Sequence, residues 1–138
     1  MKIFQETITV ETRKVFDFVN LDEKIQEAVE KSKVKNGFVL LRSPHNTATI
    51  VCNEDDQLVL DDLKRVMLSL TPESLGLKHS YEGIDNARAH QIVSLLGHSH
   101  WLPIRDGKIS LGTWQSIFMI ELFEARRRRV EVMIVGES

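Results

Sequence analysis

The stretch from His100 to Val135, HWLPIRDGKISLGTWQSIFMIELFEARRRRVEVMIV, decides the fold class. It contains four segments rich in β-branched and apolar residues, which predict strands at His100–Ile104, Lys108–Gly112, Ser116–Phe123 and Arg129–Val135. Asp106-Gly107, between the first two, is a typical two-residue hairpin turn. Four consecutive strands favour an antiparallel meander, and therefore an α+β fold over a parallel doubly wound sheet.

The segments upstream of this stretch add strands and helices. Residues 2–11 alternate polar and apolar side chains, as in a strand with one buried face. Further strands are predicted at Lys14–Phe18, Phe38–Arg42 and Thr47–Asn53. Helices are predicted at about 21–34 (capped by Asn20 or Asp22, ended by Lys35-Asn36-Gly37), at Leu58–Leu70 and at Asn86–Leu96, the last with Asp85 as N-cap and Gly97 as stop.

No repeat, low-complexity tract or linker divides the chain, so we expect residues 1–138 to form one domain. The expected architecture is a single compact α+β domain with mixed, largely antiparallel sheet or sheets packed with about three helices.

The amino-acid composition argues against a nucleic-acid-binding or membrane protein. Apolar residues make up 42% of the chain and charged residues 28%, as in an ordinary globular protein. The net charge of −2 gives no reason to expect nucleic acid or an anionic membrane as partner. No apolar run approaches the ~20 residues of a spanning helix, and the charged, alternating N-terminus is not a signal peptide. We therefore expect a cytoplasmic protein.

Cys52, the only cysteine, excludes an internal disulfide and fits a buried structural thiol.

Residues 79–101, HSYEGIDNARAHQIVSLLGHSHW, hold four of the five histidines. On the predicted helix Asn86, His90 and Ser94 are four residues apart and share one face. The first turn of that helix offers free backbone N–H groups, a natural seat for an anion such as phosphate. The alternative is a solvated or satisfied His90, with Asp85 as a simple helix cap.

Three other features allow a functional or a structural interpretation. In a strand, His98 and His100 would lie on one face as half of a zinc site, or be ordinary surface residues. Trp114 and Gln115 beside Gly112 suit a ring-binding site or a core tryptophan after a turn. In the run Arg126–Arg129, alternate side chains share a face, which either binds phosphate or is solvated.

Taken together, these motifs resemble those of the YjbQ family, which is associated with secondary thiamine-phosphate synthase activity. The matching segments follow the family's order and cover almost the whole chain: Pro44–Ala48, Asn53-Glu54, His79, Glu82–His90, Ser94–Ser99, Pro103-Ile104, Asp106–Lys108, Leu111–Gln115, Glu121, Arg126 and Arg128. The chain departs from the family pattern at Glu124-Ala125, where the family has Gly-Pro, and at His98, where a small residue is common.

The resemblance implies a homotrimer with pockets near subunit boundaries and a phosphorylated small-molecule substrate. The implied reaction joins a pyrimidine-methyl pyrophosphate to a thiazole phosphate and releases pyrophosphate. The implied catalytic residues are His79, Asp85, Asn86 and His90. Substrate-binding residues would be His45, Ser99, Thr113, Trp114, Gln115, Glu121, Arg126 and Arg128. A divalent ion, zinc or magnesium, would be held by His79, His90 and His98.

Two other functions fit the same residues. One is a metal-dependent hydrolase or transferase of another phosphorylated small molecule, and the other is a non-catalytic trimeric metabolite-binding protein. Nucleic-acid binding through the arginine run fits least well, because the chain carries a net charge of −2.

Overall fold

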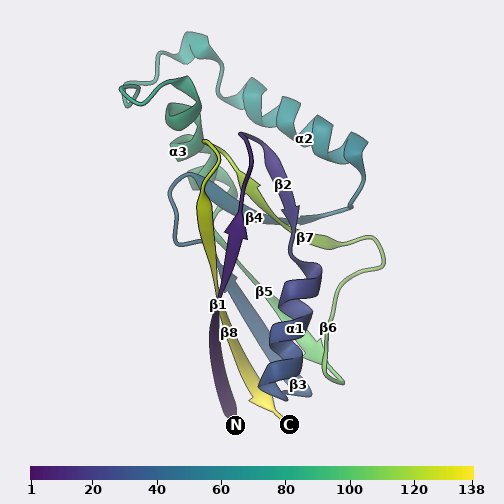
Figure 1. The fold of residues 1–138 in the computed structure, drawn as a ribbon. Coiled ribbons are helices and arrows are strands. Elements are labelled where there is room, and N and C mark those ends of the chain that lie inside the picture. Colours follow the sequence, from purple (N-terminus) through teal and green to yellow (C-terminus); the bar gives the residue numbers. More distant parts are fainter.

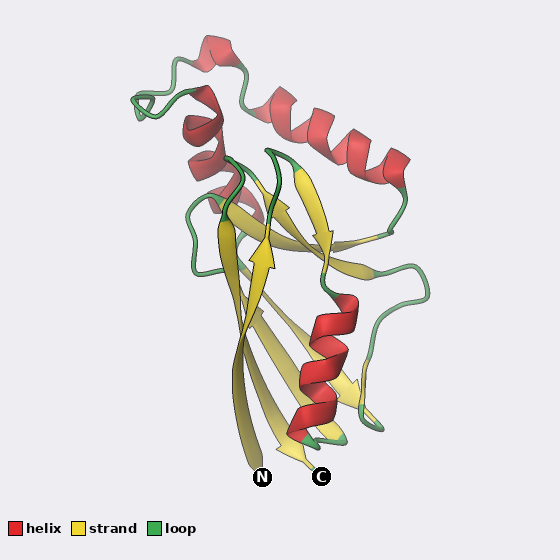
Figure 2. Ribbon diagram, in the orientation of Figure 1, coloured by secondary structure: helices red, strands yellow, loops and turns green.

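Two antiparallel sheets and three α-helices make up the fold, which the computed structural model describes for all residues from Met1 to Ser138 (Figures 1 and 2). The strands are β1 (Lys2–Glu11), β2 (Asp17–Asn20), β3 (Asn36–Arg42), β4 (Ala48–Asn53), β5 (Ser99–Arg105), β6 (Lys108–Ile109), β7 (Ser116–Glu121) and β8 (Arg127–Glu137). The helices are α1 (Asp22–Ser32), α2 (Gln57–Leu70) and α3 (Ile84–Leu96), with a short 3-10 helix at Glu73–Leu75. The α+β class, the three helices and the antiparallel pairing are confirmed.

The strands do not form the predicted meander. The larger sheet has the order β1-β8-β3-β5-β6, and the smaller sheet the order β2-β7-β4. Thus β7 lies in a different sheet from β6 and β8, its neighbours in sequence. Every residue of β7 from Ile117 to Glu121 is buried, so both faces of this strand need cover. Ile117 and Met119 pack in the core with α1 and the larger sheet, and Ile120 packs on the other side with α2 and α3.

The helices cover different parts of the two sheets. Buried residues of α1, among them Ile25 and Val29, join a core of 17 residues that includes Val39, Leu41 and Ile134 of the larger sheet. A second cluster of seven residues includes Met67 of α2, Ile92 and Val93 of α3 and Ile120 of β7. The two clusters place α1 on one face of the larger sheet and leave that sheet's opposite face without a helix.

Several predicted element boundaries are shifted. β2 begins at Asp17 because Phe16 has a positive φ of 58° and turns the chain first. α1 ends at Lys33, in the left-handed conformation with φ 61°, and Asn36 and Gly37 open β3. α3 begins at Ile84 after Gly83 (φ 96°), so Asp85 lies in the first turn and is not the N-cap. The Asp106-Gly107 turn is confirmed, with both φ values positive.

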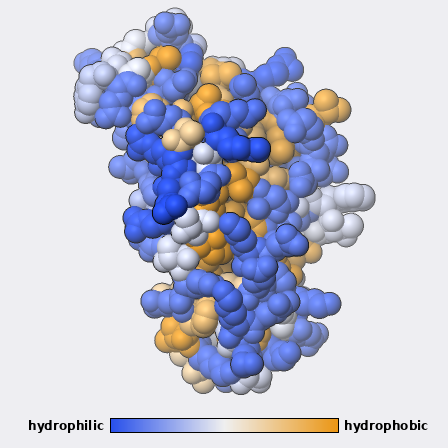
Figure 3. Space-filling model, viewed as in Figure 1, coloured by the Kyte–Doolittle hydropathy of each residue, from blue (hydrophilic) through white to orange (hydrophobic).

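None of the helices is long and apolar enough to cross a membrane. Cys52 is only partly buried, against the larger core cluster, and that burial raises the pKa of its thiol. Figure 3 shows apolar surface in the middle of the view, bordered by polar groups.

Candidate functional site

The first turn of α3 carries the polar residues that the sequence placed together. Gly83 precedes the helix without a side-chain cap, so backbone N–H groups of the first turn lack an intrahelical partner. Asp85 is half-buried in this turn and places a carboxylate there. The turn therefore offers both hydrogen-bond donors and an acidic group to anything bound beside it.

Asn86 lies in the same turn and is only 3% exposed. Its Oδ1 atom is buried and has no hydrogen-bond partner in the chain. A buried acceptor of this kind costs about 1–3 kcal/mol unless a donor reaches it. A bound N–H or O–H group, from a ligand or a water molecule, would remove that cost.

His90 follows Asn86 by one helical turn and lies against His79, from the segment before the helix. The ring centroids of the two histidines are 4.6 Å apart with planes at 72°, and the ring centroids of His79 and Tyr81 are 4.5 Å apart. The structure therefore brings His79 and His90 together. The two imidazoles in contact are side chains of the kind that donate or accept protons in general acid–base catalysis. Ser94, one turn further on, donates its hydroxyl to the His90 carbonyl instead, at 3.2 Å.

The predicted three-histidine metal set is not assembled within one chain. No group of three or more His, Cys, Asp or Glu side chains is placed to hold an ion. His98 is exposed and precedes β5, beyond the far end of α3. His100 contacts the Ile50 carbonyl through Nε2 at 2.8 Å, so that nitrogen is already occupied in the fold. His79 and His90 remain as two potential ligands.

Arg128 and Glu121 lie in the interior, 3% and 0% exposed. Arg128 donates through Nε and Nη2 to both carboxylate oxygens of Glu121, and through Nη2 to Thr47 Oγ1 at 2.8 Å. Glu121 also accepts from Thr12 Oγ1 at 2.6 Å and from the Phe123 N–H at 3.0 Å. Burial alone would raise the pKa of Glu121, but these donors hold the pKa below its usual value. Both charges are therefore satisfied inside the chain.

The alternation predicted that Arg126 and Arg128 share a strand face, and this prediction is wrong. It is exposed, precedes β8, binds Glu124 at 2.7 Å and lies over the Phe123 ring at 4.9 Å. The strand starts one residue later than that prediction required, so the alternation does not extend to Arg126.

His45 occupies the loop between β3 and β4, beside the arginines. Its Nε2 accepts a hydrogen bond from the Arg129 backbone N–H at 2.9 Å. Burial, followed by the charges of Arg128 and Arg129, lowers the pKa of His45. The imidazole is thus held neutral, with its proton on Nδ1.

The remaining predicted substrate residues lie elsewhere. Thr113, Trp114 and Gln115 belong to the loop between β6 and β7, on the opposite side of the molecule from α3 (Figure 1). Trp114 is 73% exposed, and Gln115 accepts the Gly112 N–H at 2.8 Å. Ser99 is exposed at the start of β5. One chain therefore distributes the predicted residues among α3, the arginine end of the sheet and this loop.

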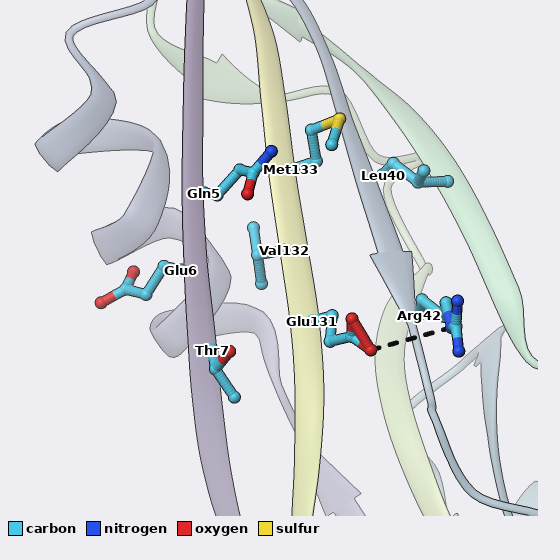
Figure 4. Close-up of a pocket in the computed structure, with 8 residues that line it drawn as sticks. All are labelled: Gln5, Glu6, Thr7, Leu40, Arg42, Glu131, Val132 and Met133. Atoms are coloured by element: carbon cyan, nitrogen blue, oxygen red, sulfur yellow. Dashed lines mark ion pairs between the residues drawn. The ribbon is translucent and has the colours of Figure 1, made fainter.

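Sequence reasoning missed a hollow of ≈ 480 Å³ on the uncovered face of the larger sheet (Figure 4). It is lined by Gln5, Glu6, Thr7, Leu40, Arg42, Glu131, Val132 and Met133. Arg42 and Glu131 form an ion pair across it at 3.8 Å. The alternation in residues 2–11 predicts that the polar side chains of this strand face solvent. It does not predict which strands lie beside it, and the hollow is formed with those neighbouring strands.

Comparisons with known proteins agree on one family. The family model described as "UPF0047 protein YjbQ-like" matches residues 6–137. A UPF0047 protein of Archaeoglobus fulgidus is 36% identical over 126 residues, covering 91% of this chain and 96% of that protein. A UPF0047 protein of Methanocaldococcus jannaschii is 39% identical over 130 residues, covering 94% and 92%. The crystal structure of a YbjQ-like protein of unknown function from Sulfolobus solfataricus superposes with a TM-score of 0.87 at 35% identity, covering 99% of both chains.

Proposed function

The chain belongs to the YjbQ-like UPF0047 family, and we propose that it is an enzyme acting on a phosphorylated small molecule at the start of α3. The reaction to test first is the one that the sequence resemblance implies. In it, a pyrimidine-methyl pyrophosphate joins a thiazole phosphate and pyrophosphate leaves.

The observation that carries the proposal is the buried Asn86 Oδ1 without a partner. Folding places a polar atom in the interior at a cost, which is unusual outside functional sites. The neighbouring groups are a carboxylate, two imidazoles and free backbone N–H groups, which are the groups that general acid–base catalysis uses.

In this proposal Asn86, the His79–His90 pair and the first-turn N–H groups of α3 have separate roles. Asn86 Oδ1 accepts an N–H or O–H of the substrate and orients it. His90, with His79 against it, gives or takes the proton of the group that leaves or attacks. The first-turn N–H groups bind substrate oxygens, and their fixed orientation lowers the cost of charge that develops there.

A divalent ion, zinc or magnesium, would supply charge stabilisation for a departing pyrophosphate. His79 and His90 would provide two nitrogen ligands, and the remaining ligands would have to come from water, substrate or a neighbouring chain. No step of the proposal depends on such an ion.

We also propose that the chain works as a homotrimer. The predicted substrate residues lie at three separated places, so a site that uses all of them needs residues from more than one copy. The uncovered face of the larger sheet also presents Trp101 (66% exposed), Ile3 (62%), Phe38 (40%) and Leu40 (37%). Cross-strand pairing places Phe38 between Val135 and Pro103, and Leu40 between Met133 and Trp101, so these side chains form adjacent rows. A second copy would bury this apolar surface.

The experiment is an assay of pyrophosphate release from the pyrimidine and thiazole phosphates, followed by phosphate release from other phosphorylated small molecules. Asn86→Ala and His90→Ala should each lower turnover at least about a hundred-fold, as expected for an orienting group and a proton donor. Ser94→Ala, on the same helix, is the matched control and should keep full turnover. Binding without turnover would favour the non-catalytic metabolite-binding protein. Turnover that survives Asn86→Ala would rule out this site.

A further inference from the structure

The first residues of β8, around Arg129, have no pairing partner in β3, unlike the rest of the strand. β3 pairs with β8 only as far as the Arg42–Glu131 pair, so the Arg129 N–H has no partner in β3. The β3–β4 loop supplies one, since His45 Nε2 accepts this N–H at 2.9 Å. The Ser43 hydroxyl donates to the Ala48 carbonyl at 2.9 Å and the Thr47 side chain binds Arg128, so the loop is fixed at both ends. His45 is therefore held in place rather than free in solvent.

The arginine run is mostly neutralised inside the chain. Arg126 pairs with Glu124 at 2.7 Å, Arg127 with Glu11 at 2.7 Å, and Arg128 with Glu121 in the interior. Arg129 is exposed and is the only arginine of the run that pairs with no carboxylate. Glu121 has no free capacity for it, because Arg128, Thr12 and Phe123 already occupy both carboxylate oxygens.

We propose that Arg129 and His45 form a binding site for a small oxyanion, a phosphate or a carboxylate group. The guanidinium offers paired N–H donors that match two oxygens of such a group. His45 adds a second kind of donor, because its Nε2 accepts from the backbone and its proton must lie on Nδ1. Thr9, exposed and directly opposite Arg129 on β1, places a hydroxyl beside the same position.

The local charge supports this assignment. Burial, and after it the charges of Arg128 and Arg129, lowers the pKa of His45, while Glu121 acts in the opposite direction. Arg129, which pairs with no carboxylate, leaves a positive potential beside the imidazole. A bound anion would offset that potential in a chain whose net charge is only −2.

This site is separate from the one proposed at the start of α3. The Ser43 N–H donates to the His98 carbonyl at 2.8 Å, and Thr49 binds the Gly97 carbonyl, so the His45 loop lies at the C-terminal end of α3. A helix of 13 residues is about 20 Å long. Within one chain the two sites therefore lie apart, and the inference goes beyond the proposed function because the anion site uses no residue of α3.

The test is NMR of the full chain, following the His45 imidazole and Arg129 guanidinium signals while inorganic phosphate replaces chloride at constant ionic strength. A parallel titration uses acetate. For at least one of the two anions, we expect both sets of signals to shift until the site is saturated. The two titration curves should give the same dissociation constant. Arg129→Gln should weaken that binding about ten-fold or more, the loss expected for a charge-assisted contact. Arg127→Gln is the matched control, because Arg127 lies two residues away on the same face and is held by Glu11; it should change the constant less than about two-fold.

Two results would overturn the proposal. One is an absence of saturable shifts at His45 with either anion. The other is equal weakening of anion binding by Arg129→Gln and Arg127→Gln. That result would mean that the positive charge of this surface attracts anions in general, without a specific binding site. Because Arg129 is exposed, a melting temperature unchanged in Arg129→Gln would show that the variant is folded.

Discussion

The Arg128 guanidinium donates to both carboxylate oxygens of Glu121, with neither residue more than 3% exposed. Arg128 belongs to β8 of the larger sheet and Glu121 to β7 of the smaller sheet. The pair therefore ties the two sheets together, with Thr12 and Thr47 completing its hydrogen bonds. Two residues that the resemblance implied for substrate binding thus have a structural task in the folded chain.

Removing one member of this pair should be strongly destabilising, because it leaves the other charge buried and unpaired. We expect Arg128→Met or Glu121→Gln to lower the free energy of unfolding by about 3–5 kcal/mol in urea denaturation. The double variant should cost less than the sum of the two. Arg127→Ala, which breaks the exposed pair with Glu11, should cost at most about 1 kcal/mol. Similar losses for Arg128→Met and Arg127→Ala would contradict the structural role.

Glu121 should also set the acid limit of stability. Its pKa in the folded chain lies below the usual value of 4.5, so below that value the unfolded chain takes up the proton first. The stabilisation is complete above pH 4.5 and is lost as the pH falls through the lower folded pKa. The free energy of unfolding, measured from pH 7 to pH 3, should fall less steeply in Glu121→Gln than in the natural chain. Parallel curves would show that other groups control acid unfolding.

His45 should produce a separate dependence at higher pH. Its pKa is lowered on folding, first by burial and then by Arg128 and Arg129, so the unfolded chain binds its proton more readily. Stability should therefore be constant above pH 6.5, the usual value for the group, and decrease below it until the folded pKa is reached. His45→Gln should remove this decrease in denaturation curves recorded between pH 5 and pH 8. If the variant keeps the same slope, His45 is not the group responsible.

Asn86 should show opposite effects on stability and function. Asn86→Leu removes a buried acceptor that has no partner, so the free energy of unfolding should stay unchanged or rise, by at most about 1–3 kcal/mol. Turnover or ligand binding at the start of α3 should be lost. As control, Thr49→Val removes a buried hydroxyl that does bind the Gly97 carbonyl, and it should lower stability by about 1 kcal/mol. Large destabilisation by Asn86→Leu would mean that the side chain is satisfied in the fold.

Assembly is tested through the uncovered sheet face. Light scattering should give about three times the chain mass of 15.8 kDa at micromolar concentration. Trp101→Glu, on that face and 66% exposed, should shift the protein to the monomer because it puts a charge into an apolar interface. Leu58→Glu, 73% exposed on α2, should leave the assembly intact. A natural chain that is monomeric would exclude the homotrimer.

The types of the helices and strands, and most of their positions, could be predicted from the amino-acid sequence. Alternation predicted β1, and the Asp106-Gly107 pair predicted a turn with two positive φ values, which the structure has. The spacing of Asn86 and His90 placed both on one helix face, and His79 does lie against His90. These features are local: they follow from the side-chain periods of strands and helices and from the conformations that single residues permit.

Which strands are neighbours, and with that the role of the charged residues, depends on contacts between distant parts of the chain. Consecutive strands at the end of the chain predicted a meander, yet β7 pairs with β2 and β4 while β8 pairs with β1 and β3. Pairing between distant segments depends on which buried faces complement each other, and no local pattern records that choice. For the same reason the alternation in the run Arg126–Arg129 could only divide the four arginines between two faces. The fold buries Arg128 against Glu121, pairs Arg126 with Glu124 and Arg127 with Glu11 at the surface, and leaves Arg129 beside His45 without a carboxylate.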